Sequence, residues 1–256
     1  MAVILTASNL SKIFETESGE PIQAVYSVSL SVTENEFVCI VGPSGCGKST
    51  LLRIISGLEK ATSGRVVFRN QEIRKPVLAI GMVFQEYSLF PWLQVIDNVA
   101  AGPEFTGMKK KERLKIAEHY LSVVGMSDFS HAFPHELSGG MRQRVAIARA
   151  FANDPEILLM DEPFGSLDAH TRILLQKELL RMRETNRKTI LFVTHSVDEA
   201  VYLGDRVIIM SARPARIRET LELDMAHPRS RANPEFGRLT DHILRELEEE
   251  VMGIHN

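Results

Sequence analysis

The stretch at residues 36–55, EFVCIVGPSGCGKSTLLRII, decides the class of fold. It begins as a short apolar run, turns through a segment rich in glycine from Gly42, and continues from Lys48 with leucine and isoleucine at helical spacing. The segment from Gly42 to Ser49 fits the pattern G-x-x-x-x-G-K-[ST], in the order of strand, loop and helix that a phosphate-binding loop requires. We therefore predict an α/β fold built around a phosphate-binding loop.

The chemistry of this loop follows from its residue types. Glycines let backbone N–H groups turn inward around a β-phosphate, and the helix that follows adds the positive end of its dipole. Lys48 is expected to reach the β- and γ-phosphates, and the Ser49 hydroxyl to ligate Mg²⁺. The alternative is a glycine-rich turn that only resembles the motif. The predicted nucleotide-binding residues are Gly42, Pro43, Ser44, Gly45, Cys46, Gly47, Lys48, Ser49 and Thr50.

Composition excludes some classes of function. Lys and Arg total 30 against 33 Asp and Glu, a net charge of −3, which gives no general attraction to nucleic acid or anionic lipid. We therefore expect no nucleic-acid partner. No apolar run approaches the roughly 20 residues needed to span a bilayer, and the first residues lack the pattern of a signal peptide. We expect a cytoplasmic protein, in which Cys39 and Cys46 stay reduced.

The chain divides into segments of different character. Residues 1–35 alternate polar and apolar, which predicts an antiparallel β layer. Continuous apolar runs at 36–87 and 153–225 predict a core with a parallel sheet. Residues 88–152 read as an α-helical insert, so the whole cassette is predicted to span 1–225. The tail, 226–256, contains an amphipathic helix with Leu239, Ile243, Leu247 and Val251 on one stripe, and we favour docking onto the core over a partner contact.

Polar residues follow three of the predicted strands. Asp161 and Glu162 end the run ILLM, where Asp161 is expected to hold Mg²⁺ and Glu162 to polarise the attacking water. A solvated turn is the alternative for this pair. His195 ends TILFVTH and is expected to contact the γ-phosphate, although a lone histidine is usually structural. Gln85 ends IGMVFQ, so that its amide oxygen can ligate the metal or orient water. We predict Glu162, His195 and Gln85 as catalytic residues.

A second segment, LSGGMRQR at 137–144, also has the residue types of a phosphate cradle. Together with the phosphate loop, Gln85, Asp161-Glu162, SLD at 166–168 and His195, it resembles the ATP-binding cassette of ABC transporters over residues 3–220. The resemblance implies a P-loop ATPase whose two cassettes pair head to tail around two MgATP, most simply as a homodimer. It also implies residues that complete the partner's site: Ser138, Gly139, Gly140, Met141 and Asp168.

The same resemblance carries two finer expectations. Phe14 matches the aromatic residue that stacks on adenine, with a core phenylalanine as the alternative. Met141 stands where the family usually has glutamine, which loses an amide able to contact ribose or the facing chain. The backbone and Ser138 contacts are expected to survive this change.

Several stretches are similar to the nitrate, sulfonate and taurine branch of bacterial importers, among them DEPFGSLDAHTR and SARPARI. The similarity implies a subunit at the cytoplasmic face of the membrane that drives a separate permease, with a solute-binding protein choosing a small anionic solute. A cassette of DNA maintenance would need a long heptad insert, and a translation-associated protein normally carries two cassettes. A non-catalytic nucleotide-binding regulator is a further alternative, which a phosphate-release assay would decide.

The segment after Gln85, EYSLFPW, concentrates large apolar side chains around a proline that prevents a regular helix or central strand. Such a patch needs cover, and aromatic residues are favoured anchors at interfaces. We predict that Tyr87, Leu89, Phe90 and Trp92 form the permease contact. The alternative is that these side chains pack beneath the helical insert.

Overall fold

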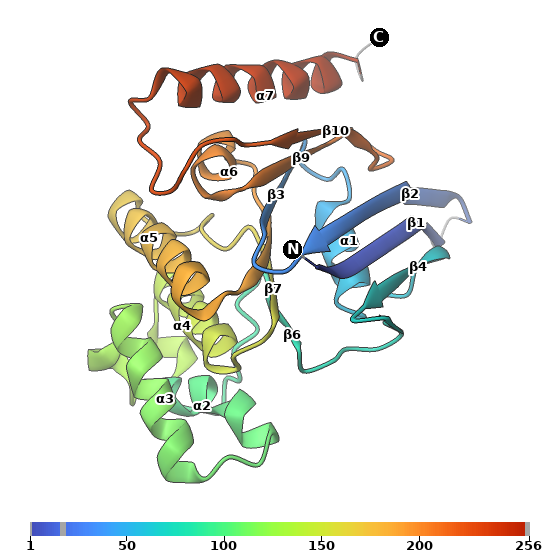
Figure 1. Ribbon diagram of the computed structural model, residues 1–256. Helices are drawn as coiled ribbons and strands as arrows, with labels where there is room; N and C mark the ends of the chain where they lie inside the picture. The colour runs from blue at the N-terminus through green and yellow to red at the C-terminus, as the bar shows by residue number, and fades with distance from the viewer. Residues whose placement is uncertain (1, 16–18, 254–256) are drawn as a thin grey trace. The chain divides into compact units, whose positions relative to one another are not determined.

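The computed structural model describes residues 2–15 and 19–253 and shows two compact units. The first comprises residues 1–77 and 187–256, and the second comprises residues 78–186. Figure 1 shows both units coloured along the chain. In the described residues, no helix combines the length and the hydropathy that crossing a bilayer requires.

An antiparallel layer begins the first unit. Its strands are β1 (Val3–Glu15), β2 (Pro21–Thr33), β4 (Ser63–Phe68) and β5 (Gln71–Glu72), in the spatial order β2-β1-β4-β5 (Figure 1). The layer is wider than the predicted 1–35, because the second edge of β1 pairs with β4, with Ala7 opposite Val66. Val28, Leu30 and Val32 alternate inward along β2, as the pattern of a half-buried strand requires.

The parallel strands of the first unit carry the phosphate loop. The spatial order is β10 (Ile217–Glu222), β9 (Arg206–Met210), β3 (Phe37–Val41) and β8 (Thr189–Val193), with β3 parallel to β8 and β9 and with β10 antiparallel to β9. Every residue of β3 and β8 is buried, which explains their unbroken apolar sequences. The helices of this unit are α1 (Lys48–Ile55), α6 (Val197–Leu203) and α7 (Pro234–Met252).

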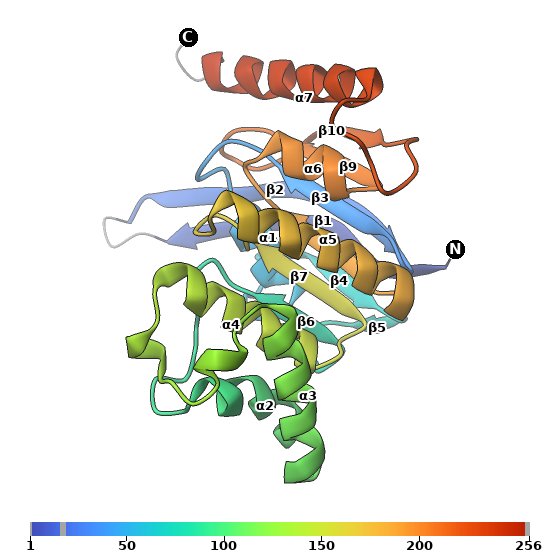
Figure 2. The ribbon, with the colours of Figure 1, turned by 90° about the vertical axis from the view of Figure 1, so that its left-hand side faces the viewer.

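The second unit combines two parallel strands with a helical cluster. β6 (Ile80–Val83) pairs with β7 (Ile157–Asp161), with Ile80 opposite Ile157. α2 (Val95–Phe105), α3 (Lys110–Val123) and α4 (Gly139–Ala152) pack on one another through buried side chains such as Val99, Leu121 and Phe151 (Figure 2). These three helices lie within the predicted insert. α5 (Ala169–Asn186) and the short 3₁₀ helices Ser127–Phe129 and Pro134–Glu136 complete the unit.

The C-terminal helix α7 packs on its own unit, against α6 and β9 (Figures 1 and 2). Phe236, Leu239 and Ile243 are buried, whereas Leu244 is exposed, so the apolar stripe faces inward. The side chain of Val251, predicted for the same stripe, lies outside the described part of the chain. Docking onto the core is therefore the alternative that the structure supports.

Candidate nucleotide-binding site

The phosphate loop joins β3 to α1 and can be formed only with glycine at its tightest point. Gly47 has a φ of 122°, and a Cβ there would lie 2.5 Å from the carbonyl oxygen of Ala24 in β2. Residues other than glycine rarely adopt this φ. The neighbouring atom belongs to the backbone of β2, which can move only at a high cost in energy. Gly42 is also enclosed, because its Cβ would lie 3.0 Å from the Cβ of Met210. Gly47 is therefore required sterically, and Gly42 is tightly enclosed.

Lys48 places its ammonium group inside the curl of this loop. Its Nζ donates hydrogen bonds of 2.8 Å to the carbonyl oxygens of Gly42 and Pro43, and the residue is only 5% exposed. It also opens α1, whose N-cap residue, Gly47, has no side chain to satisfy the first N–H groups. A buried cation and a helix N-terminus together favour an anion at the loop.

Cys46, in the middle of the motif, is a buried free thiol, as is Cys39 in β3. Burial raises the pKa of the Cys46 thiol, while the neighbouring Lys48 acts in the opposite direction. Burial likewise raises the pKa of Cys39. Both groups are therefore protonated near neutral pH, so that neither adds negative charge beside the loop.

Phe14 and His195, two further predicted site residues of the first unit, are both exposed. Phe14 lies in β1 opposite Ile22, and the Lys12 ammonium lies 4.7 Å from the centre of its ring. The predicted alternative of a core phenylalanine is therefore wrong for Phe14. His195 follows the buried Thr194, whose hydroxyl donates a 2.6 Å hydrogen bond to Glu199 and so fixes the chain where the strand ends.

The turn between β9 and β10 supports the loop from another side, which sequence reasoning missed. Arg213 donates a 3.1 Å hydrogen bond to the Gly45 carbonyl oxygen. Ala215 pairs with Ala24 in β2 by a 3.0 Å backbone hydrogen bond, and its Cβ lies 3.1 Å from where a Cβ on Gly47 would be. The stretch SARPARI contains both residues, but its sequence does not indicate this contact, because the contact depends on pairing between distant strands.

In the second unit, the predicted catalytic residues meet at the ends of paired strands. Asp161 ends β7 and is 2% exposed, so a charged group is held at the end of an apolar strand. Glu162 follows with a φ of 46°, in the left-handed region that non-glycine residues seldom adopt. The register of β6 and β7 brings Gln85 to it: the Gln85 amide nitrogen lies 3.5 Å from a Glu162 carboxylate oxygen. The structure thus places Gln85 and Glu162 together, as their strand-end positions predicted.

The segment LSGG opens α4. Ser138 is the N-cap residue, and its hydroxyl accepts a hydrogen bond of 3.3 Å from the Met141 N–H. A Cβ on Gly139 would lie 2.8 Å from the Tyr87 hydroxyl, and one on Gly140 would lie 3.3 Å from the Ser166 carbonyl oxygen. Ser138 is exposed, and Gly139 and Gly140 have no side chains of their own to cover the backbone at the start of the helix. This is a second anion-binding geometry in the chain.

Asp168 is exposed and stands immediately before α5. Its carboxylate accepts a 2.9 Å hydrogen bond from the Thr171 N–H, which lowers the pKa of Asp168. The residue is therefore a charged helix cap within its own unit.

The predicted coupling segment is covered more than its sequence suggested. Asn98 holds the backbone of Phe90 through hydrogen bonds of 2.8 and 3.1 Å, and the Arg149 guanidinium lies 5.5 Å from the Phe90 ring. Tyr87 stacks under Arg142, at 5.2 Å, and Leu89 is half-buried. Trp92 is 71% exposed and lies 5.6 Å from Phe90. In this segment, Trp92 is therefore exposed, whereas Tyr87, Leu89 and Phe90 are half-buried.

A strand, phosphate loop and helix with a buried lysine, together with an acidic strand end and a glycine-opened helix, define an ATPase of the P-loop class. Comparison with known proteins narrows the class. The sequence pattern of the ABC transporter family matches residues 25–165, just over half of the chain. The chain therefore belongs to the ABC transporter family and is an ATP-binding cassette ATPase.

Individual relatives are similar over nearly the whole chain. An uncharacterized ABC transporter ATP-binding protein of Methanocaldococcus jannaschii is 51% identical, covering 98% of this chain and 94% of the relative. The taurine import ATP-binding protein of Roseobacter denitrificans is 44% identical, covering 97% of both chains. The aliphatic sulfonates import ATP-binding protein of Bacillus thuringiensis is 41% identical, covering 95% of this chain and 96% of the relative.

A solved structure shows the same fold. An ATP-binding cassette, described as a dimer in a post-hydrolysis state bound to ADP and phosphate, superposes with a TM-score of 0.80 at 35% identity. It covers 87% of this chain and is itself covered completely. The α/β architecture inferred from the sequence is thereby confirmed.

Proposed function

We propose that this chain is the ATP-hydrolysing subunit of an importer for a small anionic solute of the taurine and sulfonate kind. The observation that carries the proposal is the phosphate loop, in which Gly47 is sterically obligatory and Lys48 is buried. Similarity to taurine and aliphatic sulfonate import proteins supports the transport role and the class of solute. The subunit would act at the cytoplasmic face of the membrane, together with a permease and, indirectly, a solute-binding protein.

In this proposal the residues of the phosphate loop, Gly42 to Thr50, bind the phosphates of ATP, with Lys48 neutralising the β- and γ-phosphates. Phe14 stacks on the adenine through its exposed ring, on the face that the Lys12 ammonium does not cover. Glu162 is the general base that takes a proton from the attacking water. Gln85, 3.5 Å away, orients that water, and His195 contacts the γ-phosphate.

The donor set fits Mg²⁺. The Ser49 hydroxyl, the Gln85 amide and the Asp161 carboxylate all offer oxygen, which is the ligand type that Mg²⁺ prefers. Asp161 is a buried carboxylate, and such a group favours a cation beside it. We propose that these three residues hold Mg²⁺, which, when bound, neutralises charge on the phosphates.

Two copies of the chain would complete each other's sites. Dimeric structures of a similar cassette support pairing. We propose that Ser138, Gly139, Gly140 and Met141 receive the γ-phosphate of the partner's nucleotide, because they form the N-terminus of α4, where the positive end of the helix dipole favours an anion. Asp168 of the same chain would also contribute to the partner's nucleotide site.

The permease contact is proposed for the segment from Tyr87 to Trp92. Trp92 supplies an exposed aromatic anchor, while Tyr87, Leu89 and Phe90 form its half-buried base. Since the segment follows Gln85 directly, a change at Gln85 during hydrolysis would reach the contact through only a few residues.

Substitution Glu162→Gln tests the catalytic assignment. Glutamine keeps the size and the hydrogen-bonding reach of the side chain but cannot accept a proton, so ATP should still bind while phosphate release falls at least 100-fold. Nucleotide affinity and phosphate release are measured on the same preparation. Near wild-type turnover would show that Glu162 is not the base. Low turnover in the wild type itself would favour the non-catalytic regulator.

Mixed dimers test the shared site. One purified heterodimer joins a chain carrying both Lys48→Ala and Ser138→Arg to a wild-type chain, so that both sites are damaged. The other heterodimer has the changes on separate chains, which leaves one site intact. We expect ATP-dependent closure and single-site turnover only in the second heterodimer, and equal behaviour would contradict pairing of this kind.

The double change Leu89→Ser and Phe90→Ser tests the permease contact. Assembly with the permease that this subunit serves should be lost, while ATP hydrolysis by the isolated chain persists. Phe105→Ser is the matched control, because Phe105 is an exposed aromatic residue of the same unit outside the segment. Unchanged assembly, or a collapsed melting transition in the double variant, would refute the proposal.

A further inference from the structure

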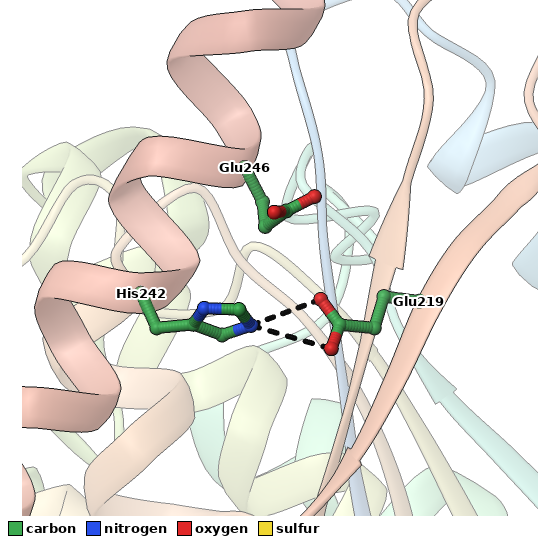
Figure 3. Close-up of side chains that lie close together, drawn as sticks. All are labelled: Glu219, His242 and Glu246. Atoms are coloured by element: carbon green, nitrogen blue, oxygen red, sulfur yellow. Dashed lines mark hydrogen bonds and ion pairs between the residues drawn. The ribbon is translucent and has the colours of Figure 1, made fainter.

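A cluster of metal-binding side chains lies between β10 and α7, and the assigned function does not use it. Figure 3 shows Glu219 on the strand facing His242 and Glu246 on the helix. His242 Nε2 lies 3.0 and 3.3 Å from the two carboxylate oxygens of Glu219. Nitrogen and oxygen atoms from the three side chains lie within 4.8 Å of one another.

The secondary structure directs these three side chains to one place. His242 and Glu246 are four residues apart, so they share a face of α7 one turn from each other. Glu219 alternates with exposed neighbours on β10 and lies on the same side of that strand as Ile217 and Leu221, which are half-buried. Ile243, which lies between His242 and Glu246 in the sequence, is buried and so anchors this part of α7.

The local charge favours a cation. Beside Glu219 on β10, α7 carries the carboxylates of Glu246, Glu249 and Glu250, and Arg218 is paired with all three of these. Arg218 Nε binds only one oxygen of Glu246, at 2.6 Å, and Glu219 is paired instead with the His242 imidazole. One guanidinium and one imidazole do not balance four carboxylates.

We propose that Glu219, His242 and Glu246 form a site for a divalent transition metal of the Zn²⁺ type. One imidazole nitrogen with two carboxylate oxygens is a ligand set for Zn²⁺, Co²⁺ or Ni²⁺, whereas Mg²⁺ and Ca²⁺ prefer oxygen alone. Zn–N and Zn–O bonds of about 2.0–2.2 Å put tetrahedral ligand atoms roughly 3.3 Å apart. The His242 and Glu219 atoms already have that spacing, and a carboxylate oxygen of Glu246 lies within 4.8 Å of both.

Metal binding at this site joins the C-terminal helix to the sheet. One ligand comes from β10 and two come from α7, so the ion binds well only while the helix is docked. A ligand that binds one state alone favours that state by mass action, about 100-fold at a free concentration 100 times the dissociation constant. The metal needs the lone pair of His242 Nε2, so the ring must carry its remaining proton on Nδ1 when the ion is bound.

The test is a titration of the untagged full-length chain with Zn²⁺, without nucleotide and in the presence of excess Mg²⁺. Calorimetry should give one site with a dissociation constant below about 10 µM, and Co²⁺ in its place should give the visible absorption of a tetrahedral complex. His242→Ala should weaken binding at least 100-fold, and Glu219→Gln at least 10-fold. Hydrogen exchange in α7 should slow when Zn²⁺ is added to the wild type.

Glu249→Gln is the matched control, since it removes a carboxylate of the same helix and a partner of Arg218 but no proposed ligand. It should bind Zn²⁺ within about 3-fold of the wild type. Equal affinity in the wild type and His242→Ala, or loss of binding in Glu249→Gln, would overturn the site. If His242→Ala fails to fold, Glu219→Gln decides alone, because it leaves the sequence of the helix unchanged.

Discussion

Arg229 and Arg231 lie two residues apart and differ sharply in environment, which makes them a direct test of what holds the tail. Arg229 is 6% exposed and donates to backbone carbonyl oxygens of Val201 at 2.6 Å, Met225 at 3.0 Å and Leu223 at 3.2 Å, and also to that of Gly204. Its guanidinium therefore joins the C-terminal end of α6 to the segment that leads into α7.

Arg231 is half exposed and pairs with Asp198, with its guanidinium 4.2 Å from the centre of the Tyr202 ring. Arg229→Met keeps much of the side-chain volume but removes the guanidinium donor from four carbonyl groups, of which that of Leu223 still accepts a 2.9 Å hydrogen bond from the Met225 N–H. Because hydrogen bonds to a charged group contribute about 1.5–3 kcal/mol each and are not additive, we expect a loss of about 3–5 kcal/mol. Arg231→Met removes an exposed ion pair and should cost about 1 kcal/mol or less.

Urea unfolding followed by circular dichroism gives the two free energies, and hydrogen exchange in α7 shows where the loss occurs. Exchange in α7 should accelerate strongly in Arg229→Met and little in Arg231→Met. If the two variants lost equal stability to within about 1 kcal/mol, the buried guanidinium would not be the anchor of the tail.

Further substitutions test other parts of the structure. Gly47→Ala should abolish nucleotide binding, measured with a fluorescent ATP analogue, because its Cβ would meet a β2 carbonyl oxygen at 2.5 Å; Gly19→Ala, with open space around it, should bind normally. Ser138→Ala should destabilise the start of α4 by about 1 kcal/mol, seen as faster amide exchange in its first turn, and unchanged exchange would count against the cap. Ile243→Ala should lower the free energy of unfolding by about 2–5 kcal/mol and its exposed neighbour Leu244→Ala by less than 1 kcal/mol, and the reverse order would mean that α7 docks by another face.

The sequence predicted those parts of the site whose residues form a motif of fixed spacing. The phosphate loop needs glycines, a lysine and a serine at fixed spacing between a strand and a helix, and all of these lie between Gly42 and Ser49. Gln85 and Glu162 were predicted from another regularity, since parallel strands end at one edge of a sheet. Their 3.5 Å contact follows from the register of β6 and β7.

The parts that sequence did not predict depend on pairing between distant segments. The sequence RVVFRN at 65–70 has the pattern of a strand, but nothing in it indicates that this strand extends the antiparallel layer by pairing with β1. The support of the loop by Arg213 depends on the position of the turn between β9 and β10. The cover over Phe90 comes from Asn98 and Arg149, whose orientation toward that ring only the packed helices define. The proposed metal ligands on β10 and α7 likewise meet only after the tail has docked.

The turn between β9 and β10 has a consequence for how this chain can evolve. On one side Arg213 bonds to the phosphate loop at Gly45, and on the other the Ala212 N–H donates a 2.9 Å hydrogen bond to Glu250 near the end of α7. Two short contacts thus connect the first quarter of the sequence to its last helix. A change at Glu250 can therefore reach the phosphate loop through a single turn, and we expect lineages that shorten or replace the tail to change the turn at 211–216 as well.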